Sequence, residues 1–241
     1  MIVKEFLDQR WKLIGGLALG VGTVVTGLVV PQIYRNTADP DFRRTIAEMT
    51  GDYAAYLWVL AFNPVNGLGL ILMLLAALIG ASLIAGEVSR GTIFVLLSRP
   101  QPRSHILLTK YDVGAAILLA VILTLLVLTA VLGHPQHVGG TLISALLLWL
   151  GSLFVLGLAT LFSALMGDVL RPLALSVTVL ALLAVLPTLL QLPATWRLTS
   201  SWTSLLAFLG QAFPVRQLLV SVVAALLPLL LALRLFRRQQ C

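Results

Sequence analysis

Residues 141–166 read TLISALLLWLGSLFVLGLATLFSALM, a run of 26 residues without Asp, Glu, Lys, Arg or His. A helix needs roughly 17–25 apolar residues to cross the hydrocarbon core of a bilayer, so this run can span a membrane. Similar runs occupy residues 13–30, 68–86, 113–132, 173–190 and 218–233, and the last span extends past Arg234 to residue 236. The last run is long enough because Arg234 can extend its charged end toward the headgroups. The sequence therefore predicts six membrane-spanning helices.

The composition excludes a water-soluble globular protein. Of the 241 residues, 59% are hydrophobic and 10% are charged, against about 45–50% and about 25% in a typical soluble domain. The mean hydropathy is +1.03. We find no internal repeat and no low-complexity linker, so we expect one all-α transmembrane domain over residues 1–241. The only cysteine, Cys241, excludes an intramolecular disulfide and a cysteine-based metal cluster.

The positive charge is distributed as in a multi-pass membrane protein. The formal net charge is +7, but the basic residues flank apolar runs and form no stripe of the kind that binds nucleic acid. With the amino terminus inside, the cytoplasmic segments hold Lys4, Arg10, Lys12, Arg90, Arg99, Arg103, Lys110, Arg171, Arg234, Arg237 and Arg238. The outer segments hold Arg35, Arg43, Arg44, Arg197 and Arg216. This asymmetry predicts that both termini are cytoplasmic and that the inner basic residues bind anionic lipid headgroups.

Three polar segments predict additional helices. Leu7 and Trp11 share an apolar face before the first span, which predicts an amino-terminal helix in the membrane interface. The pair Asp39-Pro40 begins a periodic segment that predicts an amphipathic outer helix. Between the fifth and sixth spans, breaks at Pro193 and Pro214 around short apolar pieces predict a re-entrant segment.

The segment from Glu87 to Lys110 carries the most information. A carboxylate after a span would lie at the negative end of the helix dipole, so we expect a helix break near Gly86. A short cytoplasmic helix over residues 88–98 would place Ile93, Leu96 and Leu97 on one face, and two prolines would end it. On these residues alone, a loop resting on lipid headgroups remains an equal alternative.

This segment resembles the signature loop of ABC-type-two exporter permeases. The resemblance is carried by Gly86-Glu87, Gly91-Thr92-Ile93, Leu96-Leu97-Ser98, Pro100, Arg103 and Lys110. The six-span plan is most similar to the compact permeases of the nitrous-oxide-reductase maturation group. The resemblance implies a coupling helix that docks on an ATP-binding ABC subunit. The coupling residues it implies are Glu87, Arg90, Gly91, Thr92, Ile93, Leu96, Leu97, Ser98, Pro100 and Arg103.

The resemblance also implies the partners and the location. The chain would be an exporter permease in the inner membrane of a prokaryotic cell, paired with a second copy as a homodimer. The turn over residues 167–172 is similar to the family's minor second cytoplasmic contact. In the first span, Gly16 and Gly20 have the spacing of a close helix contact and are candidates for dimer packing.

The sequence contains no phosphate-binding loop of the Gly-x-x-x-x-Gly-Lys-Ser/Thr type. We therefore expect no catalytic, cofactor or metal site in this chain, and ATP and Mg²⁺ in the partner subunit. His134 and His137 lack a nearby carboxylate or cysteine, so we expect them to be solvated. The main alternative is an ion-coupled secondary transporter or channel, which usually keeps ionisable residues at membrane depth. Apart from Arg234 near the end of the last one, the six predicted spans lack such residues. The sequence also shows no nucleophile, base or metal cluster of the kind that an intramembrane enzyme needs.

Overall fold

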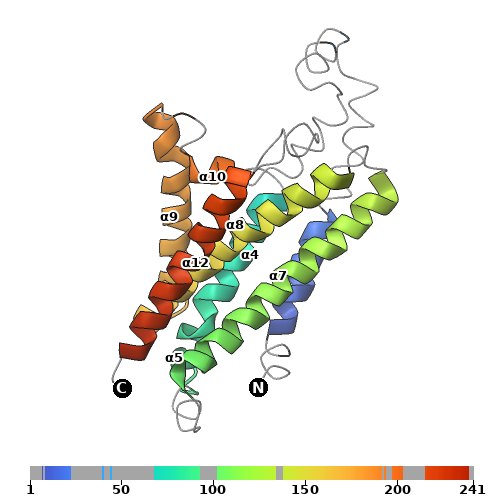
Figure 1. Cartoon of the computed structure of the whole chain (residues 1–241). Helices are drawn as coiled ribbons and strands as arrows, with labels where there is room; N and C mark the ends of the chain where they lie inside the picture. The colour runs from blue at the N-terminus through green and yellow to red at the C-terminus, as the bar shows by residue number, and fades with distance from the viewer. Residues whose placement is uncertain are drawn as a thin grey trace.

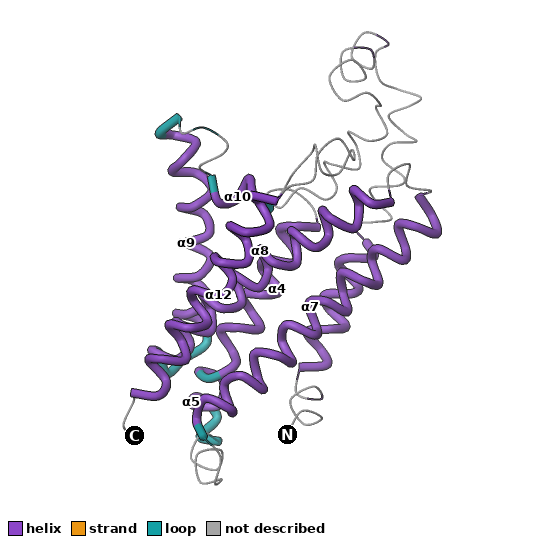
Figure 2. The backbone as a smooth tube through the Cα atoms, in the orientation of Figure 1, coloured by secondary structure: helices purple, strands orange, loops and turns teal. Residues whose placement is uncertain are grey.

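The computed structural model describes residues 7, 9–22, 40, 44, 68–92, 102–133, 138–191, 193, 197–202 and 215–238. Regular secondary structure within these residues is helical throughout. This confirms the predicted all-α class. Long helices packed side by side form the body of the protein (Figures 1 and 2).

The helices follow the predicted apolar runs. Residues 9–22 are helical. The later helices are α4 (Leu68–Leu83), α5 (Ala85–Ser89), α7 (Arg103–Gly133), α8 (Val138–Leu165), α9 (Leu170–Leu189), α10 (Leu198–Ser201) and α12 (Val215–Arg238). By length and composition, candidate membrane spans within the described residues are Ser104–Val127, Leu142–Leu165, Leu170–Leu189 and Val215–Phe236, with a shorter apolar helix at Gly69–Leu83.

The helix that contains the third predicted span begins before that span. The sequence places it at residues 113–132, but α7 begins at Arg103 and its candidate span begins at Ser104. Lys110 and Asp112 therefore lie inside a candidate span, although the sequence predicted no ionisable residue in this span. The physical reason is that the charge of Lys110 is balanced by a partner distant in sequence, as described below.

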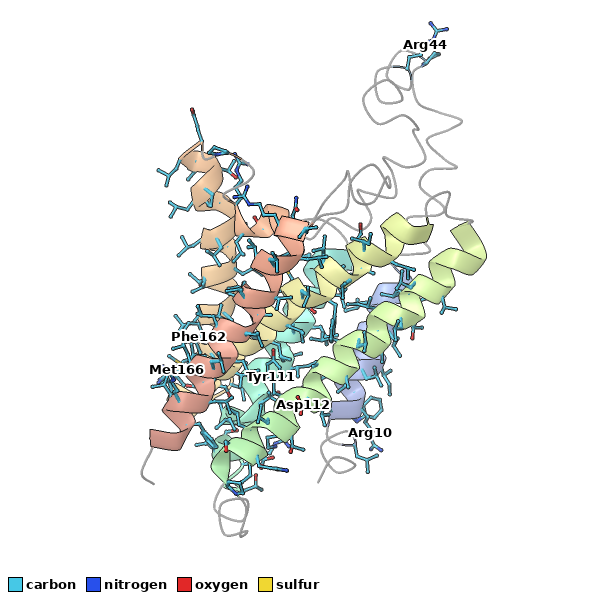
Figure 3. The ribbon with its side chains drawn as sticks, viewed as in Figure 1. Arg10, Arg44, Tyr111, Asp112, Phe162 and Met166 are labelled. Carbon is cyan, nitrogen blue, oxygen red and sulfur yellow. The ribbon has the colours of Figure 1, made fainter. Side chains whose placement is uncertain are left out.

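Successive long helices run in alternating directions (Figure 1). α4 descends to α5, α7 rises from there, α8 returns, α9 rises and α12 returns. The end of the bundle at which α4 leads into α5 is called the α5 end. The helix over residues 9–22 also begins at the α5 end. Arg10 lies at the α5 end and Arg44 lies at the opposite end (Figure 3).

The main core lies where α4, α7 and α8 meet. Gly80 allows α4 to approach α8 closely, because a Cβ at this position would lie 2.6 Å from the carbonyl oxygen of Leu156. Tyr111 of α7 donates a hydrogen bond from its hydroxyl to the Leu153 carbonyl at 3.1 Å, and Figure 3 marks its place on α7. Small residues and side-chain hydrogen bonds to backbone carbonyls are the contacts that hold helices together in membranes.

Gly16 and Gly20 make their close contacts within the chain. A Cβ at Gly16 would lie 2.5 Å from a methyl carbon of Leu75 on α4, and one at Gly20 would lie 2.8 Å from Leu125 on α7. Both glycines are buried. The absence of side chains at these two positions lets the first helix approach α4 and α7 of the same chain. Their role in dimer packing stays a prediction.

The outer faces of α9 and α12 are apolar. Exposed side chains on them include Leu182, Val185, Leu189, Val223, Leu227 and Leu230. Exposure of an apolar surface of this extent to water is unfavourable, so the surface suits contact with lipid or another protein. The helical bundle is therefore compatible with a membrane protein.

The predicted additional helices are described only in part. The amphipathic outer helix lies outside the described residues except for Pro40 and Arg44. Within the predicted re-entrant segment, α10 is followed by the buried Trp202, whose ring lies 5.5 Å from that of Phe154 on α8. The amino-terminal helix continues without a break from residue 9 into the first apolar run, so its described part is not a separate element.

Candidate functional site

The candidate site is the junction of α4, α5 and α7 at the α5 end of the bundle. α4 ends at Leu83, the chain bends at Ile84, and α5 begins at Ala85. The predicted break near Gly86 therefore exists, two residues earlier than expected. Glu87 lies in the first turn of the new helix, where the helix dipole favours a carboxylate.

Ser163 of α8 holds the bend. Its Oγ accepts hydrogen bonds from the backbone N–H groups of Ile84 and Ala85, at 3.2 and 2.8 Å. The same hydroxyl donates to the Ala81 carbonyl at 2.8 Å. A helix break leaves backbone N–H and C=O groups without their helical partners. The buried Ser163 hydroxyl bonds these groups and so removes the free-energy cost of burying them unpaired.

α5 ends much earlier than the predicted helix over residues 88–98. It ends at Ser89, and Gly91 adopts the left-handed conformation with a φ of 69°. The Gly91 amide donates to the Val88 carbonyl and the Thr92 amide donates to the Glu87 carbonyl, both at 3.0 Å. This paired pattern is the Schellman motif, which terminates helices at a left-handed glycine. The apolar spacing suggested a continuous helix, but the glycine ends it.

Glu87 and Lys110 form a buried ion pair. Glu87 Oε1 lies 3.0 Å from Lys110 Nζ, and the two side chains are 12% and 2% exposed. The other carboxylate oxygen of Glu87 accepts a hydrogen bond from the Thr92 hydroxyl. One carboxylate thus connects the turn that ends α5 to the first third of α7. A charge buried to this degree is stable only with such a partner.

α5 also packs against the turn between α8 and α9. A Cβ on Gly167 would lie 3.6 Å from Val88, and one on Gly86 would lie 4.0 Å from Val169. In this turn Asp168 accepts a hydrogen bond from the Arg171 amide at 2.9 Å and forms an ion pair with the Arg171 guanidinium at 3.0 Å. The two segments predicted to face the cytoplasm are therefore adjacent in space.

The structure brings together part of the predicted coupling set. Glu87 lies in α5, Arg90, Gly91 and Thr92 form the turn after it, and Arg103 begins α7. The remaining predicted positions lie outside the described residues: Ile93, Leu96, Leu97, Ser98 and Pro100. Their apolar face thus stays a prediction.

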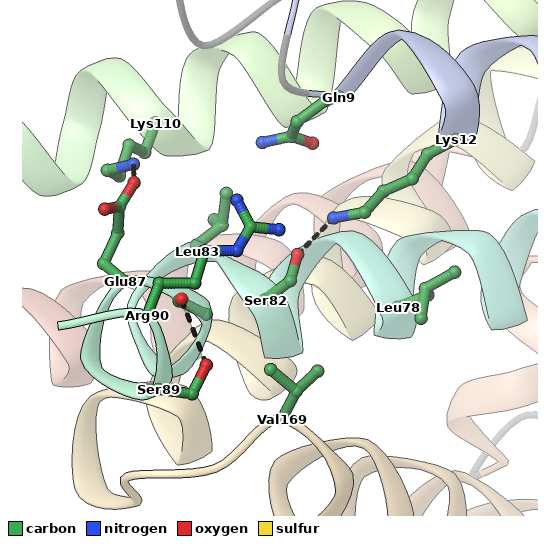
Figure 4. A pocket seen from close by; sticks show the side chains of 11 residues that line it. Gln9, Lys12, Leu78, Ser82, Leu83, Glu87, Ser89, Arg90, Lys110 and Val169 are labelled. Atoms are coloured by element: carbon green, nitrogen blue, oxygen red, sulfur yellow. Dashed lines mark hydrogen bonds and ion pairs between the residues drawn. The ribbon is translucent and has the colours of Figure 1, made fainter. Parts of the chain in front are cut away.

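A cavity of about 260 Å³ lies beside the ion pair. Its lining comes from the first helix, α4, α5, α7 and Val169 (Figure 4). On one side Lys12 donates a hydrogen bond to Ser82 Oγ, which donates in turn to the Ile79 carbonyl at 2.7 Å. On the other side lie Lys110 and Glu87.

Sequence reasoning missed several residues of this junction. Ser163 and Ser82 are hydroxyl groups inside apolar runs, which is a weak signal because small polar residues are common in spans. Gln9 and Lys12 precede the first apolar run, and their approach to α4 depends on how the first helix packs. Within the described residues no three or more His, Cys, Asp or Glu side chains gather in a way that could hold a metal ion.

The sequence matches the model of a family described as "Protein of unknown function (DUF2705)" over residues 28–237. The chain therefore belongs to this family. No curated protein matches the sequence.

Proposed function

We propose that the chain is the permease subunit of an ATP-driven ABC transporter of the exporter kind. In this proposal it crosses the membrane six times, with both termini in the cytoplasm. Two copies form the translocation pathway, and separate ATP-binding subunits hydrolyse ATP with Mg²⁺. The proposal rests on the resemblance of residues 86–110 to a coupling segment and on the way α5 is held at the end of the bundle.

The attachment of α5 is the observation that carries the proposal. Glu87 connects the end of α5 to α7 through Lys110, and Ser163 connects its beginning to α8. Val88 lies against the turn that precedes α9. A partner that pushes on the segment after Gly91 would therefore move several long helices at once. Transmission of force requires such a rigid connection, because packed helices shift as near-rigid bodies.

The mechanism follows from two such junctions in a dimer. Closure of two ATP-binding subunits around ATP would bring the two α5 junctions together. The attached helices would then exchange an inward-facing cleft for an outward-facing or occluded one. The apolar character of the helices suits a lipid-like or amphipathic cargo.

Substitution of Leu96 tests the docking step. If this residue is buried in a cleft of an ATP-binding subunit, Leu96→Asp buries a charge without a partner, which costs several kcal/mol. We expect the variant complex to lose its ATPase subunit or to hydrolyse ATP without transport. Gln101→Asp places the same charge at a polar position of the same segment and should retain both.

The readouts are copurification of the ATPase and substrate-stimulated hydrolysis in lipid nanodiscs, with size-exclusion chromatography as the folding control. Normal ATPase retention and transport by well-folded Leu96→Asp would refute the coupling assignment. Sustained ATP hydrolysis by the chain alone, with other subunits excluded by mass spectrometry, would refute the proposal that separate subunits hydrolyse the ATP.

One observation favours the second candidate, an ion-coupled transporter or channel. Lys110 lies in the candidate span of α7 and is 2% exposed, and ionisable residues at such positions often mark ion pathways. The double variant Glu87→Gln/Lys110→Met discriminates between the two proposals. An ion-coupled mechanism that uses this pair predicts complete loss of transport, whereas a structural pair predicts retained transport in the folded double variant.

A further inference from the structure

The cavity beside α5 has a lining that suits a small anion. Among its described lining residues, Lys12, Arg90 and Lys110 are cationic and Glu87 is the only carboxylate. Counted over these described residues, the lining has a formal excess of two positive charges. Its volume of about 260 Å³ is below the roughly 300 Å³ at which sites for drug-sized molecules begin. A headgroup or an ion fits this size better than a larger ligand.

The cationic groups come from three separate elements. Lys12 lies on the first helix, Arg90 ends α5, and Lys110 lies on α7. Figure 4 shows the Arg90 side chain reaching into the cavity toward Gln9. Ser82 adds a hydroxyl beside Lys12. Convergent charged donors of this kind form the stronger, charge-assisted hydrogen bonds to phosphate oxygens.

Gln9 provides an independent sign that a ligand belongs here. Its side chain lines the cavity and is only 5% exposed, yet its Oε1 has no hydrogen-bond partner. Buried polar atoms are nearly always satisfied, so an orphaned acceptor calls for a donor that the protein does not supply. A ligand with both an anionic phosphate and a hydroxyl group would place an anion beside Arg90 and supply a hydrogen-bond donor to Gln9 Oε1.

The surface next to the cavity indicates that the ligand is a lipid. Leu70, Leu74 and Leu78 form an exposed stripe on one face of α4 that leads to Ser82 at the cavity. An acyl chain can lie along such a stripe while its headgroup enters the cavity. The cavity also lies at the α5 end, where the candidate span of α7 begins at Ser104. Lys and Arg at the end of a span lie at the level of lipid headgroups.

We propose that this cavity binds the headgroup of an anionic phospholipid. The phosphate would be held by Lys12 and Arg90, and a headgroup hydroxyl would donate to Gln9 Oε1. Bound lipid would then join the first helix to α5 and α7. This proposal does not depend on the transporter assignment and requires only that α4 and α7 lie in a membrane.

The test measures binding of defined lipids to the purified full-length chain. Phosphatidylglycerol, which carries both a phosphate and hydroxyl groups, is titrated by native mass spectrometry and by thermal shift in detergent. Phosphatidylcholine is the zwitterionic control, and inorganic phosphate tests the free ion. We expect phosphatidylglycerol to bind about tenfold or more tightly than phosphatidylcholine and inorganic phosphate to produce no comparable shift.

Variants locate the site. Arg90→Gln changes an exposed side chain and so should not disturb folding, and Lys12→Met removes the second cation. Each should weaken phosphatidylglycerol binding about tenfold. Arg10→Met is the matched control, because Arg10 is an exposed cation on the same helix that lies over Trp11 and does not line the cavity. It should bind phosphatidylglycerol like the unmodified chain.

Four results would overturn the proposal. Equal binding of the two lipids would show that the cavity does not select a phosphate anion. Unchanged binding by folded Arg90→Gln, or equal weakening by Arg10→Met, would place any selectivity elsewhere. An equal stabilisation by inorganic phosphate, lost in Arg90→Gln, would assign the cavity to the free ion instead of a lipid.

Discussion

Ser163 of α8 replaces the helical hydrogen-bond partner that Ala85 loses at the start of α5. In an unbroken helix the Ala85 amide would donate to the Ala81 carbonyl. Here the Ser163 hydroxyl lies between them, accepting from Ala85 and donating to Ala81 at 2.8 Å each. The direction of α5 is therefore set by a residue about 80 positions later in the chain.

Removal of this hydroxyl should destabilise the bundle. Ser163→Ala leaves the Ala85 and Ile84 amides buried without partners, which costs about 1–3 kcal/mol for an unsatisfied group. Ser152→Ala is the matched control: Ser152 is also fully buried on α8, but its hydroxyl donates only within its own helix, to the Trp149 carbonyl. Unfolding in mixed micelles measures both. Equal destabilisation by the two substitutions would contradict the assigned role of Ser163.

The Glu87–Lys110 pair should show strong energetic coupling. Removing one partner leaves a buried charge, so Glu87→Gln and Lys110→Met should each lower the free energy of unfolding by about 3–5 kcal/mol. The double variant Glu87→Gln/Lys110→Met removes both charges and should cost clearly less than the sum of the single changes. A double-mutant cycle by unfolding in mixed micelles checks this. Additive effects would mean that the two side chains are not coupled.

Gly80 should tolerate no larger residue. In Gly80→Ala the new methyl group would lie 2.6 Å from the Leu156 carbonyl oxygen and 2.7 Å from the Ala159 Cβ, so α4 and α8 must separate at a cost of about 1–3 kcal/mol. Gly15→Ala adds the same methyl group where no atom lies within 4 Å and should be neutral or slightly stabilising. Thermal unfolding in detergent compares the two, and similar midpoints would argue against the close crossing.

The proposed topology predicts the accessibility of single cysteines. In a Cys241→Ser background, cysteines at Asp41, His137 and Thr199 should react with an impermeant reagent from outside intact cells. A cysteine at Ser89, exposed at the end of α5, should react only after permeabilisation. The cause is the excess of basic residues on the cytoplasmic side. The reverse pattern of labelling would invert the topology and remove the basis for a cytoplasmic coupling segment.

Part of the junction of α4, α5 and α7 could be predicted from residues that are close together in sequence. A carboxylate is unfavourable at a helix carboxyl end, which correctly predicted a break before Glu87. Gly91 was also readable as a helix end, since glycine is strongly enriched just after the last helical residue. The predicted continuous helix from residue 88 is interrupted at Gly91, and its part over residues 93–98 lies outside the described residues. Both effects depend on residues close together in sequence.

The sequence by itself determined that the chain forms long apolar helices, because uncharged runs of this length can satisfy their backbone within a membrane only as helices. Only the tertiary structure decided which side chains meet. Lys110 is tolerated in an apolar helix because Glu87 of α5 forms an ion pair with it. Gly16 and Gly20 contact α4 and α7 because the first helix packs against these two helices. Such pairings depend on how helices pack in space, and the apolar periodicity of each helix is compatible with several neighbours.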